Sequence, residues 1–325
     1  MIQPVADPVT IEQAAALLRS GALCAFPTET VYGLGADATN SDAVVKLYET
    51  KGRPRFNPLI CHCADLAMAE HYALFSPLAR ELAAAFWPGP LTLVLPLKRE
   101  SGLSDLVTAG LDTVGVRVPA HPLARDLIAA LGRPVAGPSA NPSGRLSPTT
   151  ADHVHQGFAG RVPVLDGGPC EQGLESTILA VEGDTVTQLR AGALPRQQVE
   201  AALGRDIPVA AAGSAIAAPG MLRSHYAPNA LLRLDASAPQ SGEAWLGFGP
   251  GPAHDGPVLN LSPVGNLREA ARNLFSYLAR LDASGVAKIA VAPIPQNGLG
   301  EAINDRLDRA AAPRAAPAPG PGARA

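Results

Sequence analysis

The sequence predicts an α/β protein made of two units, and three observations support this prediction. Apolar segments with strand and helix character alternate along most of the chain. The 325 residues are 47% hydrophobic and 17% charged, which supplies enough apolar material for two cores. Residues 205–229 interrupt the alternation with small residues, Gly and Pro, as a linker does. We therefore expect units over 8–204 and 230–310, a linker over 205–229 and a disordered tail over 311–325.

The elements of the first unit follow from hydrophobic periodicity and from residues that begin or end helices. Thr10 is a candidate N-cap, and Gly21 follows the helix that it begins. Helices are expected over 10–20, 41–50, 76–86, 121–132, 151–158 and 194–203. Strands are expected over 22–26, 58–63, 91–97, 113–119, 134–140, 162–166, 176–181 and 185–190.

The second unit repeats the alternation on a smaller scale. A helix over 266–283 begins with an Asn266–Glu269 capping box. It carries one apolar stripe, formed by Leu267, Leu274, Leu278 and Leu281. A last helix is expected over 298–310. Strands are expected over 230–235, 244–249, 257–261 and 287–294.

Charge and hydropathy narrow the class of protein. The formal net charge of −3 argues against a generally basic coat for nucleic acid, although it is compatible with a local basic cleft. No apolar run is long enough to span a membrane. The first residues, "MIQPVADPVTIEQ", have neither the basic nor the apolar region of a secretory signal, so we expect a cytoplasmic protein.

The cysteines do not form the pattern of a small disulfide-bonded domain. They are Cys24, Cys61, Cys63 and Cys170. The "CHC" at 61–63 suggests zinc, but no second pair of ligands stands at zinc spacing. In a strand, the two cysteines would point to one face and His62 to the other. Structural cysteines are therefore the favoured interpretation, and a metal site is the alternative.

Five polar loops stand at the ends of expected strands, where open α/β sheets bind ligands. They are "PTETVYGLG" (27–35), "KGRPRFNPL" (51–59), "PSANPSGRLSPT" (138–149), "LESTI" (174–178) and "LRAGAL" (189–194). The first has hydroxyls that suit a pocket wall, but taken alone it is better explained as an ordinary turn. The third has small residues that can cradle phosphate, although Thr149 or Thr150 is also a candidate N-cap.

The second loop is the most cationic of the five. Lys51, Arg53 and Arg55 fall within five residues, and Pro54 and Pro58 restrict the backbone. Restricted arginines suit phosphate or carboxylate oxygens, whereas a solvated charged face is the alternative. The chain has no Walker loop, no Gly-x-Gly-x-x-Gly after the first strand, no Gly-x-Ser-x-Gly and no His-Glu-x-x-His, so none of the common catalytic motifs applies.

Taken together, these loops resemble the YrdC-like family of threonylcarbamoyl-AMP synthases. "FPTETVYGLG", "KGRPRFNPLICH", "GPSANPSGRLSPT" and "ESTI…LRAG" occur in the family's order and spacing, and the match covers residues 8–205. "APGMLRSHYAP", 218–228, is similar to the linker signature of the longer, two-domain form. The resemblance implies a twisted mixed sheet with helices, followed by a smaller Rossmann-like α/β domain.

The resemblance also implies an activity. A nucleotidyltransferase of this family converts L-threonine, bicarbonate and ATP into threonylcarbamoyl-AMP and pyrophosphate. The product is used to modify the tRNA adenosine beside the anticodon. A separate tRNA-modifying complex completes that modification, and this chain itself would contact RNA weakly at most. No tightly bound cofactor, protein-held metal or membrane partner is expected. Mg²⁺ would accompany ATP, held largely by phosphates and water.

The family pattern assigns the residues. It places threonine near Thr30, His62, Arg117, Ser139 and Ser176. It places ATP near Arg53, Asn57, Thr113, Asn141, Thr149, Arg190 and Tyr226. Lys51 lies beside both ligands, and Lys51 and Arg53 are the expected catalytic residues. The linker is expected to act as a lid, with Met221, Arg223, His225 and Tyr226 as its large side chains.

One position departs from the pattern. Family members often have an acidic residue four or five positions after the serine at 176, where this chain has Ala180 and then Glu182.

Two rival classes of protein remain open from the sequence. One is a non-catalytic RNA-binding module, against which the modest net charge counts. The other is a larger carbamoyl-transferring maturation factor, which would carry Cys-x-x-Cys pairs that this chain lacks.

Overall fold

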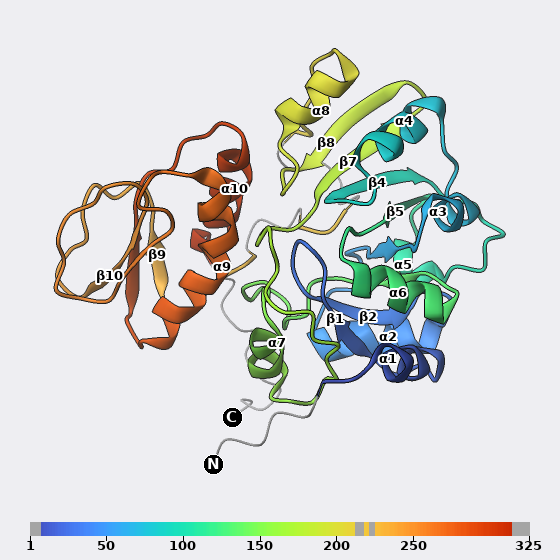
Figure 1. The fold of residues 1–325 in the computed structure, drawn as a ribbon, viewed down its shortest axis with the longest axis horizontal. Helices are drawn as coiled ribbons and strands as arrows, with labels where there is room; N and C mark the ends of the chain where they lie inside the picture. The colour runs from blue at the N-terminus through green and yellow to red at the C-terminus, as the bar shows by residue number, and fades with distance from the viewer. Residues whose placement is uncertain (1–7, 212–217, 221–224, 314–325) are drawn as a thin grey trace, which may run out of the picture.

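The computed structural model describes residues 8–211, 218–220 and 225–313, which form two sheets with their helices. The first sheet and its helices form the larger body in Figure 1, and the second forms the smaller body beside it. The expected α/β class, with a mixed sheet followed by a second small domain, is confirmed. The domain boundaries expected at 204/205 and 229/230 stay a prediction.

The first sheet has eight strands in the order β1-β2-β6-β3-β5-β4-β7-β8. Its strands pair in both directions: β3 with β5 and β4 with β7 are parallel, and the other neighbours are antiparallel. The strands are β1 (Cys24–Phe26), β2 (Gly33–Asp37), β3 (Ile60–His62), β4 (Leu91–Pro96), β5 (Thr113–Arg117), β6 (Val135–Ala136), β7 (Thr177–Glu182) and β8 (Thr185–Arg190).

The helices of the first domain begin largely where the capping residues predict. Thr10 forms a capping box with Gln13, and Gly52 ends the second helix in the left-handed conformation. The helices are α1 (Ile11–Arg19), α2 (Ser41–Lys51), α3 (Leu66–Tyr72), α4 (Pro77–Phe86), α5 (Asp105–Thr108), α6 (Pro122–Leu131), α7 (Ala151–Phe158) and α8 (Arg196–Leu203).

The two faces of the first sheet have different roles, and β3 shows the division. Cys61 and Cys63 are buried in the main apolar core. His62, between them, points to the opposite face and lines a pocket. All four cysteines are buried free thiols. The alternating faces of one strand thus separate the core from the pocket.

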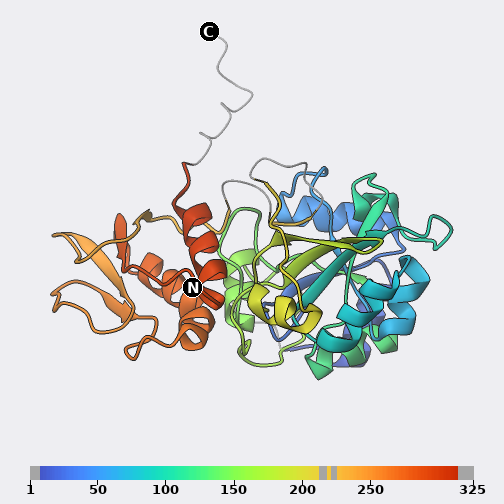
Figure 2. The same cartoon turned by 90° about the horizontal axis from the view of Figure 1, so that it is seen from above.

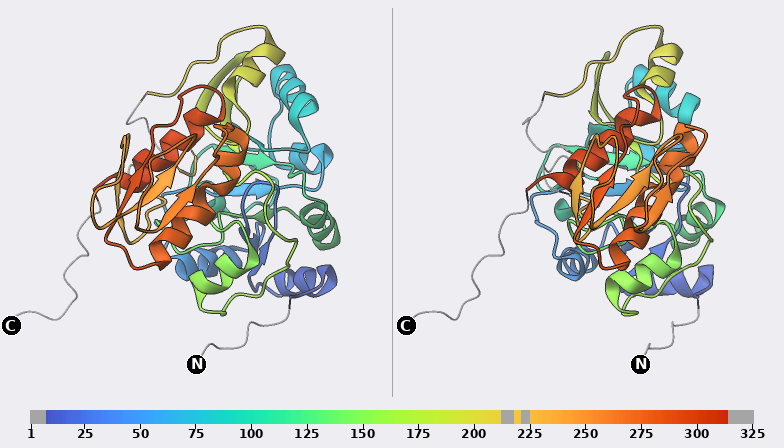
Figure 3. Two further views of the ribbon diagram at one scale, coloured as in Figure 1. Left: turned by 60° about the vertical axis from the view of Figure 1, so that its left-hand side comes forward. Right: turned by 90° about the vertical axis from the view of Figure 1, so that its left-hand side faces the viewer.

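The second domain is a two-layer α/β unit. Its four parallel strands run in the order β11-β10-β12-β9. The strands are β9 (Leu231–Arg233), β10 (Glu243–Gly247), β11 (Val258–Asn260) and β12 (Lys288–Val291), and the helices are α9 (Leu267–Ala283) and α10 (Leu299–Ala311). Seen from above, α10 lies between this sheet and the first domain (Figure 2). Figure 3 views the same domain from its outer side, with the first domain behind it.

Several expected elements differ in the structure. Residues 162–166 are not a strand, because Val164 makes only one bridge, to Ala25. The expected Asn266–Glu269 capping box is incomplete: Asn266 accepts from the first turn, but the Glu269 carboxylate accepts from Ser262. The sequence analysis also missed α3 and α5.

The strand β2 was misread as part of a loop. Its Gly33 and Gly35 suggested a turn, but both lie in extended backbone. A Cβ on Gly33 would lie 2.9 Å from the Phe26 ring. The glycines therefore let an aromatic ring of β1 pack directly on β2, a tertiary contact that local sequence does not reveal.

The described part of the linker packs against both domains. Ala218 is buried with Ile60, Val94 and Ile178 on the pocket face of the first sheet. Tyr226 is buried in the core of the second domain. The expected lid residues Met221 and Arg223 lie outside the described residues. No helix that the structure describes is long and apolar enough to cross a bilayer.

Candidate active site

The main candidate site is a pocket on the open face of the first sheet. Loops that are far apart in the sequence meet there, together with the described ends of the linker. The lining residues are Thr28, Thr30, Val31, Gly33, Arg53, Ile60, His62, Arg117, Gly137, Pro138, Ser139, Glu175, Ser176, Arg190, Pro219, Gly220, His225 and Tyr226. All five polar loops singled out in the sequence therefore lie at or beside this pocket.

Most of the expected site residues line the pocket. They are Thr30, Arg53, His62, Arg117, Ser139, Ser176, Arg190 and Tyr226. The remaining expected residues are not among its lining side chains. They are Lys51, Asn57, Thr113, Asn141 and Thr149. Which ligand each residue touches stays a prediction.

Two buried arginines in the pocket have no carboxylate partner in the described structure. Arg53 donates to the carbonyls of Asn57 and Pro58, at 3.1 and 2.8 Å. Arg190 donates to the carbonyls of Ser176 and Pro219. Burial lowers the pKa of Arg53 to about 10 and also lowers that of Arg190. The pocket therefore contains positive charge that an anion would compensate.

Lys51 lies immediately behind this pocket. It is the last residue of α2, and its Nζ donates to the main-chain carbonyls of Ser139 and Asn141. Burial, and secondarily the charge of Arg53, lowers its pKa well below the ordinary value. Lys51 thus holds the third loop against the second, in addition to any contact with a ligand.

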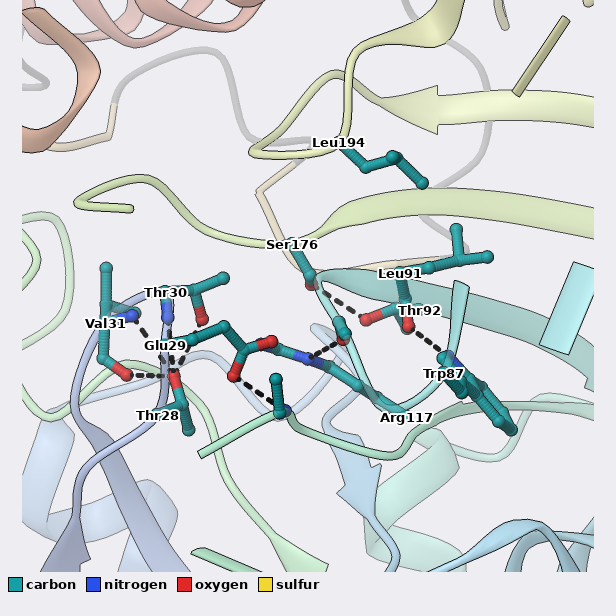
Figure 4. Close-up of polar contacts among 12 residues, drawn as sticks. Thr28, Glu29, Thr30, Val31, Trp87, Leu91, Thr92, Arg117, Ser176 and Leu194 are labelled. Carbon is teal, nitrogen blue, oxygen red and sulfur yellow. Dashed lines mark hydrogen bonds and ion pairs between the residues drawn. The ribbon is translucent and has the colours of Figure 1, made fainter. Parts of the chain in front are cut away.

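Arg117 also lines the pocket, and it has a carboxylate partner. Its Nη2 lies 2.6 Å from Oε1 of Glu29, and both side chains are almost fully buried. The other oxygen of Glu29 accepts from the main-chain N–H of Ala120. Figure 4 shows this pair beside the Thr28–Thr30 hydroxyl contact. Glu29 therefore fixes the direction of the Arg117 guanidinium.

Ser176 is positioned by a second buried contact. Its hydroxyl lies 2.8 Å from that of Thr92, on the neighbouring strand β4 (Figure 4). The guanidinium of Arg190 donates to both the carbonyl and the hydroxyl of Ser176. Among the described residues, the hydrogen-bond partners of the serine hydroxyl are a threonine and an arginine and not an imidazole, which suits a binding group better than a nucleophile.

His62 is buried in the pocket as a neutral imidazole. Burial first, and then the charge of Arg117, lowers its pKa to about 3. In the described structure its Nδ1 has no hydrogen-bond partner. A Cβ on Gly137 would lie 2.9 Å from that nitrogen, so glycine is needed there to leave the ring its place. The unpartnered nitrogen can accept a hydrogen bond from a ligand.

This neutral histidine predicts a pH dependence of stability. The unfolded imidazole takes up a proton below its ordinary pKa of about 6.5, whereas folded His62 does so only near about 3. The free energy of unfolding should therefore fall as the pH falls from 6.5 toward 3, by about 1.4 kcal/mol per pH unit from this group. Urea unfolding at several pH values should show a shallower slope for His62→Gln. His71→Gln, an exposed histidine, is the control; equal slopes for wild type and His62→Gln would contradict the assignment.

The other expected residues do not line the pocket, and their surroundings differ. Asn57 and Asn141 are buried, and each has a side-chain oxygen with no partner in the described structure. Thr113 lies on the same face of β5 as Arg117, because it is four positions before it. Thr150, and not Thr149, caps α7 by accepting from His153. Capping therefore does not account for the buried Thr149.

Sequence reasoning missed two ionic residues of the site. Glu29 and Glu175 stand inside quoted loops but were not assigned, because nothing in the local sequence shows what a carboxylate faces. Glu182, the possible substitute for the family's acidic residue, is exposed at the end of β7 and is not in the pocket. In the part of the chain that the structure describes, no three His, Cys, Asp or Glu side chains are grouped to hold a metal.

The fold and the pocket are together those of an α/β enzyme whose site, on one face of a mixed sheet, suits small anionic ligands. Comparisons identify the family. The Sua5/YciO/YrdC model, described as "Telomere recombination", matches residues 16–192. A second model, "Threonylcarbamoyl-AMP synthase, C-terminal domain", matches residues 194–312. The chain therefore belongs to the Sua5/YciO/YrdC family, in the form that has this C-terminal domain.

Individual relatives are similar to this chain over almost its whole length. The threonylcarbamoyl-AMP synthase of Bacillus subtilis is 42% identical over 95% of this chain and 94% of its own. That of Pyrococcus abyssi is 41% identical over 92% of this chain and 93% of its own. The crystal structure of P. abyssi Sua5 complexed with L-threonine superposes with a TM-score of 0.85 at 39% identity, covering 93% of this chain and 94% of that one. The resemblance found from the sequence is confirmed.

Proposed function

We propose that this chain makes L-threonylcarbamoyl-AMP from L-threonine, bicarbonate and ATP, with release of pyrophosphate. Relatives at 42% and 41% identity are named threonylcarbamoyl-AMP synthases, and a similar solved structure holds L-threonine. The product would serve the threonylcarbamoylation of tRNA by a separate complex. Because both ATP and tRNA are cytoplasmic, we also propose that the chain works in the cytoplasm.

One observation carries this proposal: Arg53 and Arg190 are buried in the same pocket without a carboxylate partner among the described residues. Isolated buried cations are costly unless an anion compensates them. ATP supplies several phosphate oxygens, which suit the donor forks of two arginines. The polyphosphate is therefore the ligand that this side of the pocket fits best.

The proposed chemistry needs no nucleophile from the protein. The threonine amine attacks bicarbonate carbon, water leaves, and an N–C bond forms the carbamate. A carbamate oxygen then attacks the α-phosphorus of ATP, and the bond from that phosphorus to the pyrophosphate oxygen breaks. The protein gathers mutually repelling anions and stabilises the charge that moves onto the leaving pyrophosphate. The neutral His62, with its unpartnered Nδ1, can accept a hydrogen bond without bringing further charge.

The two sides of the pocket suggest how the substrates divide. We assign threonine to the side that contains Arg117, which Glu29 orients, together with Thr30, His62, Ser139 and Ser176. We assign ATP to the side that contains Arg53, Arg190 and Tyr226. The family pattern adds Asn57, Thr113, Asn141 and Thr149, which do not line the pocket. Mg²⁺ would enter with ATP, held by its phosphates and water.

The described linker residues would help to exclude water. Threonylcarbamoyl-AMP is a mixed anhydride, which water destroys, so the site benefits from a cover. Pro219, Gly220, His225 and Tyr226 already line the pocket. A Cβ on Gly220 would lie 2.8 Å from Cδ of Arg190 and 3.1 Å from the hydroxyl oxygen of Tyr226, so the linker approaches the arginine as closely as glycine permits.

Pyrophosphate release tests the proposal. We expect release only when ATP, threonine and bicarbonate are all present, with an acyl-adenylate detectable by mass spectrometry. Serine should react about 10–200-fold less efficiently, because the loss of one methyl contact costs about 1–3 kcal/mol. ATP in carbonate-depleted buffer is the control. Equal release with ATP alone would make the chain a simple ATPase, and no release under any condition would favour an RNA-binding module.

A further inference from the structure

Arg306 of the C-terminal domain is a buried residue that reaches the first domain. It lies on α10, and its side chain is 1% exposed. Its Nε donates to Oε2 of Glu175 at 2.7 Å, and its Nη2 donates to the carbonyl of Ala191 at 3.0 Å. Its Nη1 contacts Asp305, so the whole guanidinium fork is occupied. An arginine that is buried and paired in this way makes specific contacts within the protein, unlike a solvated surface arginine.

Each cross-domain contact of Arg306 is next to a pocket residue. Glu175 lines the pocket and precedes Ser176. Ala191 follows Arg190. The Arg306 guanidinium also lies over the ring of Tyr226, 5.1 Å from its centroid. One side chain of the second domain therefore touches three segments of the pocket, and two of them, Arg190–Ala191 and Tyr226, belong to the ATP side of the proposed site.

Tyr226 needs such support, because its backbone is in an unfavourable conformation. Its φ of 61° lies in the left-handed region, which bulky residues rarely adopt. The ring is packed between Arg306 and Phe275 of α9, whose ring centroid lies 5.6 Å away. The C-terminal domain thus provides two of the contacts that hold the tyrosine with its hydroxyl toward Gly220 and Arg190.

Glu175 connects the same arginine to a further loop. Its other oxygen, Oε1, accepts from the Ser147 hydroxyl, so both oxygens are used. Burial alone would raise the pKa of Glu175, but the charges of Arg306 and Arg190 lower it overall. Without Arg306, this carboxylate would be buried beside Ser176 with less compensation.

We propose that Arg306 is a positioning residue, through which the C-terminal domain holds Tyr226, Glu175 and the Arg190–Ala191 segment in the arrangement that binds ATP. The inference rests on the proposed function, and it gives the second domain a role within it. The ATP side of the pocket would be complete only when the two domains are joined. The threonine side, built on Arg117 and Glu29, has no contact with Arg306 in the described structure.

Arg306→Met tests the inference in the full-length chain, because methionine keeps an unbranched side chain and removes the fork. We expect the KM for ATP to rise at least tenfold, while the KM for threonine changes less than twofold. The matched control is Arg233→Met, which breaks the pair between Arg233 and the buried Glu243 inside the C-terminal domain. This control should lower the thermal midpoint but leave both KM values unchanged.

The double variant Glu175→Gln with Arg306→Met separates positioning from stability. It removes the uncompensated carboxylate, so the thermal midpoint should recover, while the KM for ATP stays high because Tyr226 is still unsupported. If Arg306→Met alone does not fold, this double variant is compared with wild type in its place. An ATP KM within twofold of wild type in Arg306→Met, or its full recovery in the double variant, would overturn the inference.

A binding measurement separates this inference from the proposed function. ATP is titrated calorimetrically into wild type and Arg306→Met without threonine or bicarbonate. Weaker ATP binding by the variant supports the positioning role even if wild type releases no pyrophosphate. Equal ATP binding overturns that role even if wild type is fully active.

Discussion

Replacing Arg53 with alanine is expected to lower the rate of pyrophosphate release by about a thousandfold, the scale seen when one preorganised donor to a developing charge is removed. Arg53 is buried in the pocket, where burial lowers its pKa to about 10, and no carboxylate of the described residues forms an ion pair with it. Its fork is fixed by the carbonyls of Asn57 and Pro58. A polyphosphate would therefore meet a guanidinium whose direction is already set, at little further entropic cost.

Arg55 provides the matched control for this prediction. It stands in the same loop, two residues later, but its side chain is 64% exposed and lies 3.9 Å from Glu49. An exposed pair at this distance contributes little. Steady-state kinetics should therefore place Arg55→Ala close to wild type, and circular dichroism should show both variants folded. If Arg55→Ala is as severe as Arg53→Ala, the assignment of roles within this loop is wrong.

Lys51→Met is expected to reduce turnover by about a hundredfold or more, since it removes a buried charge-assisted donor and the order that it imposes on the loop. The amine of Lys51 binds the carbonyls of Ser139 and Asn141, and Ser139 lines the pocket. Without that amine, two buried carbonyls lose a donor, and the loop over 138–149 loses its anchor to α2. Both the rate and the KM for threonine should therefore worsen.

A substitution of Lys46 separates the effect of removing the Lys51 amine from a general destabilisation of helix α2. It lies on the same helix, and its Nζ also donates to a main-chain carbonyl, that of Gly21, at 2.9 Å. That contact is remote from the pocket residues and its lysine is exposed. Lys46→Met should keep wild-type kinetics, with a change in thermal midpoint of a degree or two at most. Normal turnover by Lys51→Met would show that the loop keeps its shape without the amine.

Local sequence patterns were sufficient for much of the fold. The N-cap at Thr10, the glycine that follows its helix at 21 and the N-cap at Asn266 all behave as predicted. Such signals work because they satisfy the orphan N–H and C=O groups of a helix end, which depend on a few neighbouring residues only. The alternation along β3 likewise placed Cys61 and Cys63 in the core and His62 in the pocket.

The errors fall where local signals and tertiary packing disagree. Glycines at 33 and 35 are typical of a turn, yet they belong to β2 because Phe26 packs on them. The run over 162–166 has strand composition, but only Val164 finds a strand partner. Strand formation needs a neighbour with free hydrogen-bonding groups, and the local sequence of a segment does not say whether such a neighbour exists.

The motifs in their order were enough to identify the family, and they named most of the side chains that line the pocket. What they could not supply is the pairing of charges. Arg117 with Glu29 and Arg306 with Glu175 are 88 and 131 positions apart in the chain, and only folding brings them together. Since the energy of a buried charge depends on its nearest opposite charge, only the folded chain distinguishes Arg53, which forms no ion pair with the described residues, from Arg117 and Arg306, which do.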